Sequence, residues 1–313
     1  MRWARNSRND RDRMSKRIIA IVLAGCTLLS SCCNCTKPGE TEDRLNPPGL
    51  LPMVQVINAI NANNQKISTL WATLNYSATI VDHGKAHSVS SDDGVLLYNA
   101  PTDFRLVGKK EFVGTVFDVG SNDRLFWLEV VPGTNQMWWG TYADLVQVNT
   151  ESLPIPIRPD LVMEVLGVGV INTDFNALPV PTMRYDNAAD AYILIFNLKA
   201  PDRWVAEKEV WYDRASLRPR KVILYDVNGR PVLRASLSQV RKVQMVDESN
   251  SANWPLVPGD YKLFFPDSGS RMEFALKDVR LKKGKIPNPA SFRLPDVQGT
   301  EVRATQIGGG GAQ

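Results

Sequence analysis

The sequence predicts an α+β protein that is mainly antiparallel β, in which one curved sheet carries helices on one face. Three observations lead to this prediction. Most of the body consists of short segments in which apolar and polar residues alternate, as in strands with one buried face. Turn residues separate these segments, as in a meander of hairpins. Only two segments, at about 53–69 and 160–171, have the spacing or the apolar character of helices.

The first 31 residues are typical of a bacterial export signal. Basic residues up to Arg17 precede an apolar run from Ile18 to Leu29, which is the order of segments in a secretory signal peptide. This run is much shorter than the roughly 20 residues that a transmembrane helix needs. Met14 is an alternative start, because Met14 to Arg17 alone would form a compact basic region.

The apolar run ends in Leu29-Ser30-Ser31-Cys32, which resembles the lipobox of bacterial lipoproteins. This resemblance implies that residues 1–31 are removed and that Cys32 becomes a lipid-carrying N-terminus. Cys26, after Leu23-Ala24-Gly25, matches the lipobox better as a string. Cleavage there would leave an apolar region below the usual length of roughly 7–15 residues. We therefore expect lipidation at Cys32, with Cys26 as the alternative and an ordinary signal peptide as the other possibility.

Composition argues against several classes of function. After removal of residues 1–31, 30 basic and 31 acidic residues remain, and a chain so close to neutral lacks the basic surface of nucleic-acid-binding proteins. The four cysteines are Cys26, Cys32, Cys33 and Cys35. The sequence after residue 35 therefore has no cysteine that could form a disulfide, bind a metal or act as a nucleophile.

Residues 32–52 are expected to form a flexible spacer, because this stretch is charged and rich in proline. The folded domain is expected over 53–295 and begins with a helix over about 53–69, where apolar residues recur at helical spacing. Packing must stabilise this helix, because its polar residues favour helix weakly. These polar residues are Asn61, Asn63, Asn64 and Gln65.

The strands of the first half follow this helix without a break. The apolar period changes to two at Leu70 and predicts a strand over 70–80, followed by a turn at 82–85. The loops expected at 120–123 and 132–135 are polar. Further strands are expected at about 95–98, 103–107, 112–118, 124–131 and 136–142.

The middle of the chain interrupts the strands. Its proline-rich residues 153–159 suit neither a sheet nor a helix interior. The apolar helical segment at 160–171 must lie against an apolar surface. We expect a disordered tail over 296–313, which contains four consecutive glycines. Between the helical segment and this tail, strands are expected at about 180–185, 191–198, 207–212, 221–225, 231–243, 254–265 and 272–276.

Two runs of the first half resemble a known family. Tyr98 to Gly108 contains Pro101 and Phe104-Arg105, and Phe117 to Leu128 contains Asp118 and Trp127. Together they are similar to the Pro-x-x-Phe-Arg and Asp-Gly-x-x-x-Trp core of the LolA/LolB-like lipoprotein carriers. The similarity is greatest to a lipoprotein subgroup of planctomycete-type bacteria, and it extends over roughly residues 53–280.

This resemblance implies an unclosed half-barrel of about eleven strands, whose open mouth is covered by helices and whose hollow holds acyl chains. One feature of the family is missing. Ala100 stands where LolA has an arginine that helps to hold the helical lid closed. Arg105 lies inside a strand, and we do not expect it to take over this role. The polar loops at 120–123 and 132–135 also differ from the apolar loop through which LolB accepts lipid.

The parity of the predicted strands selects the residues that point into the hollow, without distinguishing cavity from core. The lipid-cavity candidates are Leu74, Tyr76, Phe104, Leu106, Leu194, Phe196, Val210, Tyr212, Leu224, Phe274 and Leu276. The lid-helix candidates are Ile57, Ile60, Leu161, Met163, Val165 and Leu166.

No residue pattern predicts catalysis, a metal or a cofactor. The only histidines are His83 and His87, and four residues along a strand span roughly 13 Å, too far for one ion. Gly167 and Gly169 are more typical of a helix end than of a phosphate loop, because Asn172 stands where the third glycine would fall.

These observations favour a non-enzymatic, lipid-anchored periplasmic protein that holds the acyl chains of a lipoprotein or phospholipid in an apolar cavity. Its function would be lipoprotein sorting or lipid transport, with the anchor in the outer rather than the inner membrane and no nucleic-acid partner. The alternative is an envelope sensor or scaffold that binds a partner protein with the same fold. An enclosed apolar cavity of roughly several hundred Å³ would favour the first function.

Overall fold

The computed structural model describes residues 49–82, 84–131, 135–142, 159–246, 248–281, 288–298 and 300–307. The chain divides into two units, at 1–50 and 51–313, and all the elements described below belong to the second. The expected export signal, Cys26, Cys32 and His83 lie outside the described residues. The lipidation site therefore stays a prediction.

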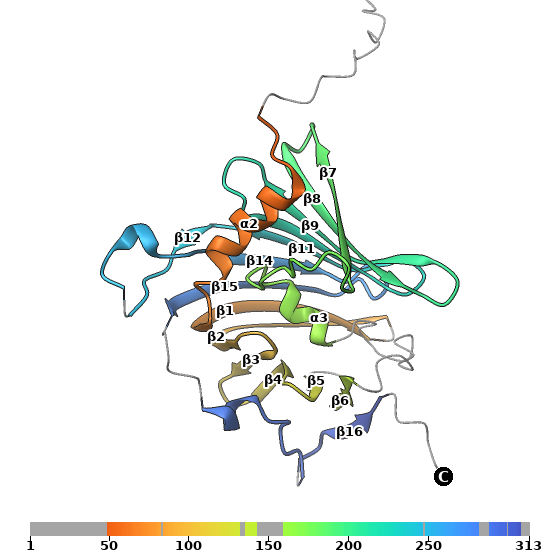
Figure 1. Cartoon of the computed structure of the whole chain (residues 1–313). Coiled ribbons are helices and arrows are strands. Elements are labelled where there is room, and N and C mark those ends of the chain that lie inside the picture. Colours follow the sequence, from red (N-terminus) through yellow and green to blue (C-terminus); the bar gives the residue numbers. More distant parts are fainter. Residues whose placement is uncertain are drawn as a thin grey trace, which may run out of the picture. The chain divides into compact units, whose positions relative to one another are not determined.

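One sheet of fourteen strands forms the body of the described part, and Figure 1 shows its strands in sequence colours. Its order is β16-β6-β5-β4-β3-β2-β1-β15-β14-β11-β10-β9-β8-β7. In chain order the strands are β1 (Thr69–Asp82), β2 (Lys85–Asn99), β3 (Asp103–Lys110), β4 (Gly114–Ser121), β5 (Leu125–Val130), β6 (Gln136–Thr141), β7 (Val180–Asp186), β8 (Ala191–Lys199), β9 (Trp204–Asp213), β10 (Pro219–Tyr225), β11 (Pro231–Ser238), β14 (Asp260–Phe264), β15 (Arg271–Arg280) and β16 (Arg303–Gln306).

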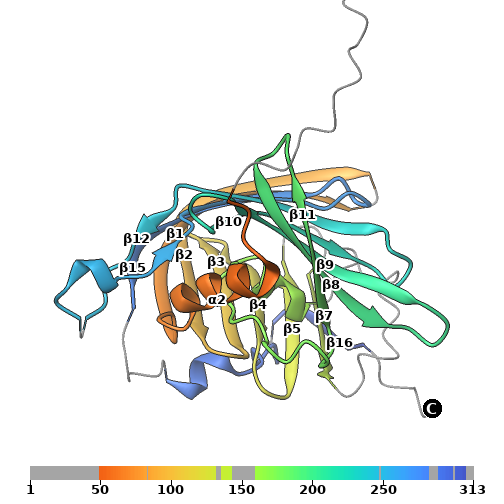
Figure 2. The ribbon, with the colours of Figure 1, turned by 45° about the horizontal axis from the view of Figure 1, so that its top comes forward.

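The sheet curves strongly but does not close, because β16 and β7 are its two edges and are not paired with each other. All neighbouring strands are antiparallel except β16 and β6. Figure 2 shows the sheet bending around the two α-helices. The prediction of one curved, unclosed antiparallel sheet with helices is therefore confirmed, although the strands outnumber the eleven expected.

Two helices lie against the concave face of the sheet. The first, α2 (Met53–Asn64), buries Val56, Ile57 and Ile60 and ends earlier than the expected residue 69. The second, α3 (Pro159–Glu164), is short, and the chain turns directly after it at Gly167, whose φ of 66° favours glycine. Below, the lid denotes α2, α3 and the segment 165–172.

Some element boundaries differ from the prediction, for identifiable reasons. Strand β2 begins at Lys85 rather than near residue 95, because residues 85–93 extend a hairpin with β1 and bury neither face. Phe112, expected to begin a strand, lies in the β3–β4 turn with a φ of 61°. The expected strand at 231–243 divides into β11 and β12 (Arg241–Lys242), and β12 pairs with β13 (Leu256–Val257) in a separate small sheet.

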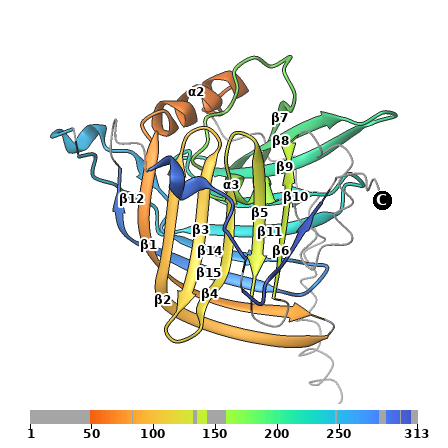
Figure 3. The same cartoon turned by 90° about the horizontal axis from the view of Figure 1, so that it is seen from below.

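The C-terminal segment covers the outer face of β3 to β6, as Figure 3 shows from below. It contains the 3-10 helix η5 (Pro289–Phe292) and β16, which pairs in parallel with β6. Phe292 is 2% exposed, and its carbonyl accepts a hydrogen bond from Asn122 at 2.9 Å. The prediction of a disordered tail from residue 296 is therefore wrong for β16, because the backbone of this strand is paired with β6. Residues 308–313 lie outside the described part.

The residues that carry the family resemblance meet beneath this segment. Asp118 is buried and accepts hydrogen bonds from Arg105 Nη2 at 2.6 Å and from Trp127 Nε1 at 2.9 Å. Arg105 also donates from Nη1 to the carbonyl of Ser291 in η5, at 2.9 Å. A side chain at Gly120 would collide with the Trp127 ring, since an added Cβ would lie 2.1 Å from it. Arg105, Asp118 and Trp127 of the motif therefore stabilise the outer face of the sheet, opposite the hollow.

We expect the variant Asp118→Asn to lower the free energy of unfolding by about 2–3 kcal/mol, because it leaves the Arg105 guanidinium without its counter-charge in a largely buried position. Urea denaturation measures this loss. Glu273→Gln is the matched control, because Glu273 pairs with Lys262 at 3.2 Å on the exposed surface. Exposed pairs contribute less than about 1 kcal/mol. Equal losses in the two variants would contradict the structural role of Asp118.

Candidate functional site

All eleven lipid-cavity candidates are buried, and none is more than 6% exposed. They point toward the concave side of the sheet, as their strand parity predicts. Only some of them line a cavity. Leu106 lines an apolar cavity, and Phe196, Val210 and Tyr212 line a second cavity of mixed polarity. Tyr76 and Phe274 line a more open pocket formed by β1, β14 and β15.

The apolar cavity lies between the sheet and α3. Its walls include Ile80 of β1, Leu106 of β3, Val119 of β4, Leu128 of β5 and Val162 of α3. All other lining side chains are hydrophobic except Ser270 and Arg271. Its volume of ≈ 60 Å³ is far below the several hundred expected. With α3 in this position, the cavity has room for only the end of an acyl chain.

The mixed cavity is larger, at ≈ 300 Å³, and lies between β8, β9 and the segment that runs from Met163 to Asn172. Ala100, which occupies the position of the family's lid arginine, lines this cavity. An ion pair joins its walls: Lys208 Nζ of β9 lies 2.8 Å from Glu164 Oε2 of α3. The same Nζ lies 4.6 Å from the ring centroid of Phe196, a cation–π distance.

Two tyrosine hydroxyls of the mixed cavity stay protonated at neutral pH. Burial and the nearby Glu164 carboxylate raise the pKa of Tyr98 to about 12. The same two causes raise the pKa of Tyr212. Both residues line the cavity, so it contains phenol groups that can donate hydrogen bonds to a ligand.

The asparagines of α2 hold the lid together. Asn61 Nδ2 donates to the carbonyl of Ile171 at 2.8 Å, and the amide of Ile171 donates back to Asn61 Oδ1 at 2.8 Å. Asn64 donates to the carbonyl of Gly169 at 2.7 Å. Asn63 makes an equivalent two-way contact with Leu256 of β13, at 3.0 and 2.8 Å. These residues weaken the helix in isolation but attach it to the segments around it.

The lid-helix candidates lie in α2, in α3 and in the two residues directly after α3. Met163 is half-buried and lines the mixed cavity. The other five candidates are all buried, namely Ile57, Ile60, Leu161, Val165 and Leu166.

One apolar surface feature escaped the sequence analysis. Phe112, at the tip of the β3–β4 hairpin, is 99% exposed, and Val113 beside it is 56% exposed. Lys109 and Lys110 precede them and are also exposed. In the sequence, Phe112 and Val113 are flanked by Lys109, Lys110 and Glu111 on one side and by Gly114 on the other. Charged residues and a glycine in this arrangement are typical of a turn. Of the two polar loops at 120–123 and 132–135, the second is described only at residue 135.

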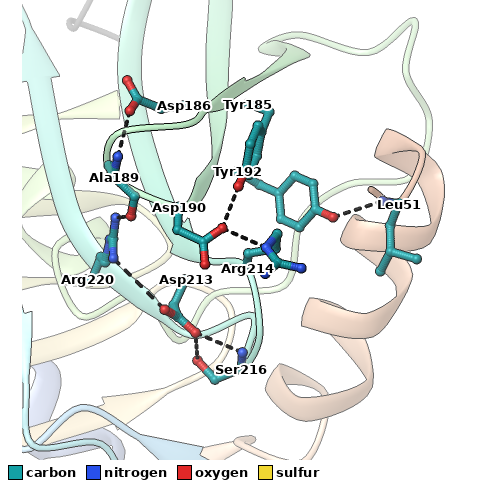
Figure 4. A network of polar contacts seen from close by, with 10 residues as sticks. All are labelled: Leu51, Tyr185, Asp186, Ala189, Asp190, Tyr192, Asp213, Arg214, Ser216 and Arg220. Atoms are coloured by element: carbon teal, nitrogen blue, oxygen red, sulfur yellow. Dashed lines mark hydrogen bonds and ion pairs between the residues drawn. The ribbon is translucent and has the colours of Figure 1, made fainter. Parts of the chain in front are cut away.

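A polar network fixes the region where the chain enters this unit (Figure 4). The amide of Leu51 donates to the Tyr192 hydroxyl at 2.8 Å. In the neighbouring β7–β8 turn, Asp190 accepts a hydrogen bond from Tyr185 and one from Arg214 Nε at 2.6 Å. The bond from Arg214 lowers the pKa of Asp190. The acidic group is thus engaged by local partners, which indicates a structural role.

Within the described ranges, no group of three or more His, Cys, Asp and Glu residues could hold a metal ion. The described helices also include none with the length and apolar character needed to cross a membrane.

No family model and no curated protein sequence matches the chain. Among solved structures, it is similar to a putative outer membrane lipoprotein-sorting protein domain from Vibrio parahaemolyticus, with 13% identity, a TM-score of 0.48, and coverage of 75% of this chain and 94% of that one. It is also similar to a LolA superfamily protein from Nitrosomonas europaea, with 12% identity, a TM-score of 0.47 and coverage of 78% and 99%.

We expect Asn61→Ala to loosen the lid, because it removes both hydrogen bonds to Ile171 and with them about 2 kcal/mol of local stability. Hydrogen exchange of the amides at 166–172 would then become faster. Asn63→Ala is the matched control, because it removes two equivalent bonds that lead to Leu256 and not to this segment. Equal exchange rates of 166–172 in the two variants would show that Asn61 does not hold the lid.

Proposed function

We propose that this protein is a non-enzymatic, lipid-anchored binding protein that holds an acyl chain of a lipid or lipoprotein under its lid. The observation that carries the proposal is the apolar cavity between the concave face of the sheet and α3. Each methylene group moved from water into such a site contributes roughly 0.8 kcal/mol. A ligand with one long chain would therefore bind mainly by burial of its tail.

Binding a whole chain requires movement of α3. This helix forms part of the wall of both cavities, through Val162 on the apolar side and through Met163 and Glu164 on the mixed side. A displacement of α3 would join the two spaces into one elongated pocket. In this proposal the closed lid is the unliganded arrangement, and the ligand stabilises an opened one.

The expected export signal and Cys32 support a location at the envelope, anchored to the outer membrane and facing the periplasm. The exposed hairpin tip with Phe112 and Val113 supports contact with a lipid surface, because apolar side chains can enter the interface while Lys109 and Lys110 attract anionic headgroups. Together these features favour lipoprotein sorting or lipid transport.

The alternative function is that of a sensor or scaffold that binds a partner protein. Trp204 and Val227 favour it, because they are 59% and 72% exposed on two adjacent hairpins. Arg203 connects these hairpins by a bond from its Nη2 to the carbonyl of Val227, at 3.3 Å. Exposed aromatic residues of this kind are common at the centre of protein interfaces.

Lipid extraction followed by mass spectrometry tests the proposed function. We expect the protein purified from its native membrane to carry lipid, and we expect Leu106→Trp to reduce the bound amount at least about fivefold by filling the apolar cavity. Leu128→Phe is a milder filling variant in case the first does not fold. Trp204→Ser is the control that should leave bound lipid unchanged. A wild-type protein without lipid, together with capture of one protein partner that Trp204→Ser abolishes, would favour the alternative.

Cys32→Ser tests the anchor. We expect it to move the protein from the membrane to the soluble fraction, because the several acyl chains of a lipoprotein hold firmly where a single chain binds only marginally. Cys26→Ser should leave the protein in the membrane fraction and its acylated N-terminal peptide unchanged in mass. Release by Cys26→Ser and not by Cys32→Ser would assign the lipid to Cys26.

A further inference from the structure

The mixed cavity contains a charged group that a purely apolar ligand would not need. Lys208 is 9% exposed, although lysine is almost never this deeply buried without a specific partner. Its partner is Glu164, at 2.8 Å. Among the described residues that line this cavity, these two are the only charged ones.

The two members of the pair are held very differently. The Lys208 side chain is 11% exposed, belongs to β9, which is paired on both sides within the sheet, and lies over the Phe196 ring. The Glu164 side chain is 33% exposed and belongs to the last turn of α3, in the lid. If α3 moves, the carboxylate leaves with it, whereas the ammonium group stays in the cavity.

An ammonium group left alone in such a place is strongly unfavourable, since a buried charge requires a counter-charge. An opened lid is therefore favoured by any ligand that brings an anion to the position vacated by Glu164. The protonated hydroxyls of Tyr98 and Tyr212 line the same cavity and can donate hydrogen bonds to that anion. The cavity thus has the groups of an anion site, with a carboxylate of the lid in the anion's place.

We propose that the mixed cavity binds the anionic head, a phosphate or carboxylate, of the amphiphile whose tail enters the apolar cavity. Lys208 is the counter-ion of this head, and Glu164 occupies the position of the head while the protein is empty. This inference rests on the proposed function and specifies the class of ligand. Release of Lys208 from Glu164 also couples head binding to the opening of α3.

Two probes with the same acyl chain test the assignment: lysophosphatidylglycerol, which is anionic, and monoacylglycerol, which is neutral. Their affinities are measured on the full chain after removal of bound lipid. We expect the wild-type protein to prefer the anionic probe by roughly tenfold, the size of one charge-assisted hydrogen bond. Lys208→Gln should abolish this preference, so that the two probes bind with equal affinity.

Two further variants sharpen the test. Glu164→Gln removes the competing carboxylate and should increase the affinity for the anionic probe, which keeps the inference testable if Lys208→Gln does not fold. Lys221→Gln is the matched control, because Lys221 lies over Trp211 at 4.2 Å, on the side of the sheet opposite to Val210 and Tyr212. It should leave both affinities unchanged.

The outcomes separate this inference from the proposed function. Binding of both probes with equal affinity, unaffected by Lys208→Gln, would overturn the head-group site but leave the carrier function in place. Failure of both probes to bind would overturn the carrier function. Inorganic phosphate that displaces the anionic probe at similar concentration would identify a free anion as the ligand and contradict the assignment to a lipid head.

Discussion

A curved sheet that does not close leaves an apolar concave face, and the rest of this structure depends on how that face is covered. Its inward side chains come from strands as distant in sequence as β1 and β15, so the chain must nearly complete the sheet before the face exists. Helices α2 and α3 cover this face incompletely, and the two cavities are the space that they leave. The opportunity to bind a ligand is therefore a consequence of the architecture.

The two faces of the sheet carry different groups of charged side chains. On the outer face, Arg105, Asp118 and Trp127 form a polar cluster that the C-terminal segment covers. On the inner face, Lys208 pairs with Glu164 of α3, in the lid. Arg105, Asp118 and Trp127 of the motif that resembles the lipoprotein carriers belong to the first group, whereas Pro101 of the same motif lines the mixed cavity.

Elements that depend on a local pattern of apolar residues can be predicted from the sequence. Elements and contacts that depend on a partner far away in the chain cannot. Apolar alternation locates β1 and the inward parity of Leu106, and the helical stripe locates Ile57 and Ile60. Strand β16 has no such signal, because its four residues are all exposed and only pairing with β6 makes them a strand. From the sequence, Asn61 is only a weak helix former. Its role in the lid could not be predicted, because its partner Ile171 lies 110 residues away. The same holds for Lys208 and Glu164, which no spacing rule connects.

An open barrel exposes two strand edges, and each could template the addition of further copies of the chain. Here each edge is blunted. Strand β7 contains Pro181, which offers no amide to an incoming strand, and exposes Arg184. Strand β16 is only four residues long and pairs in parallel. The sheet can therefore remain unclosed and still resist polymerisation through the addition of strands at its edges.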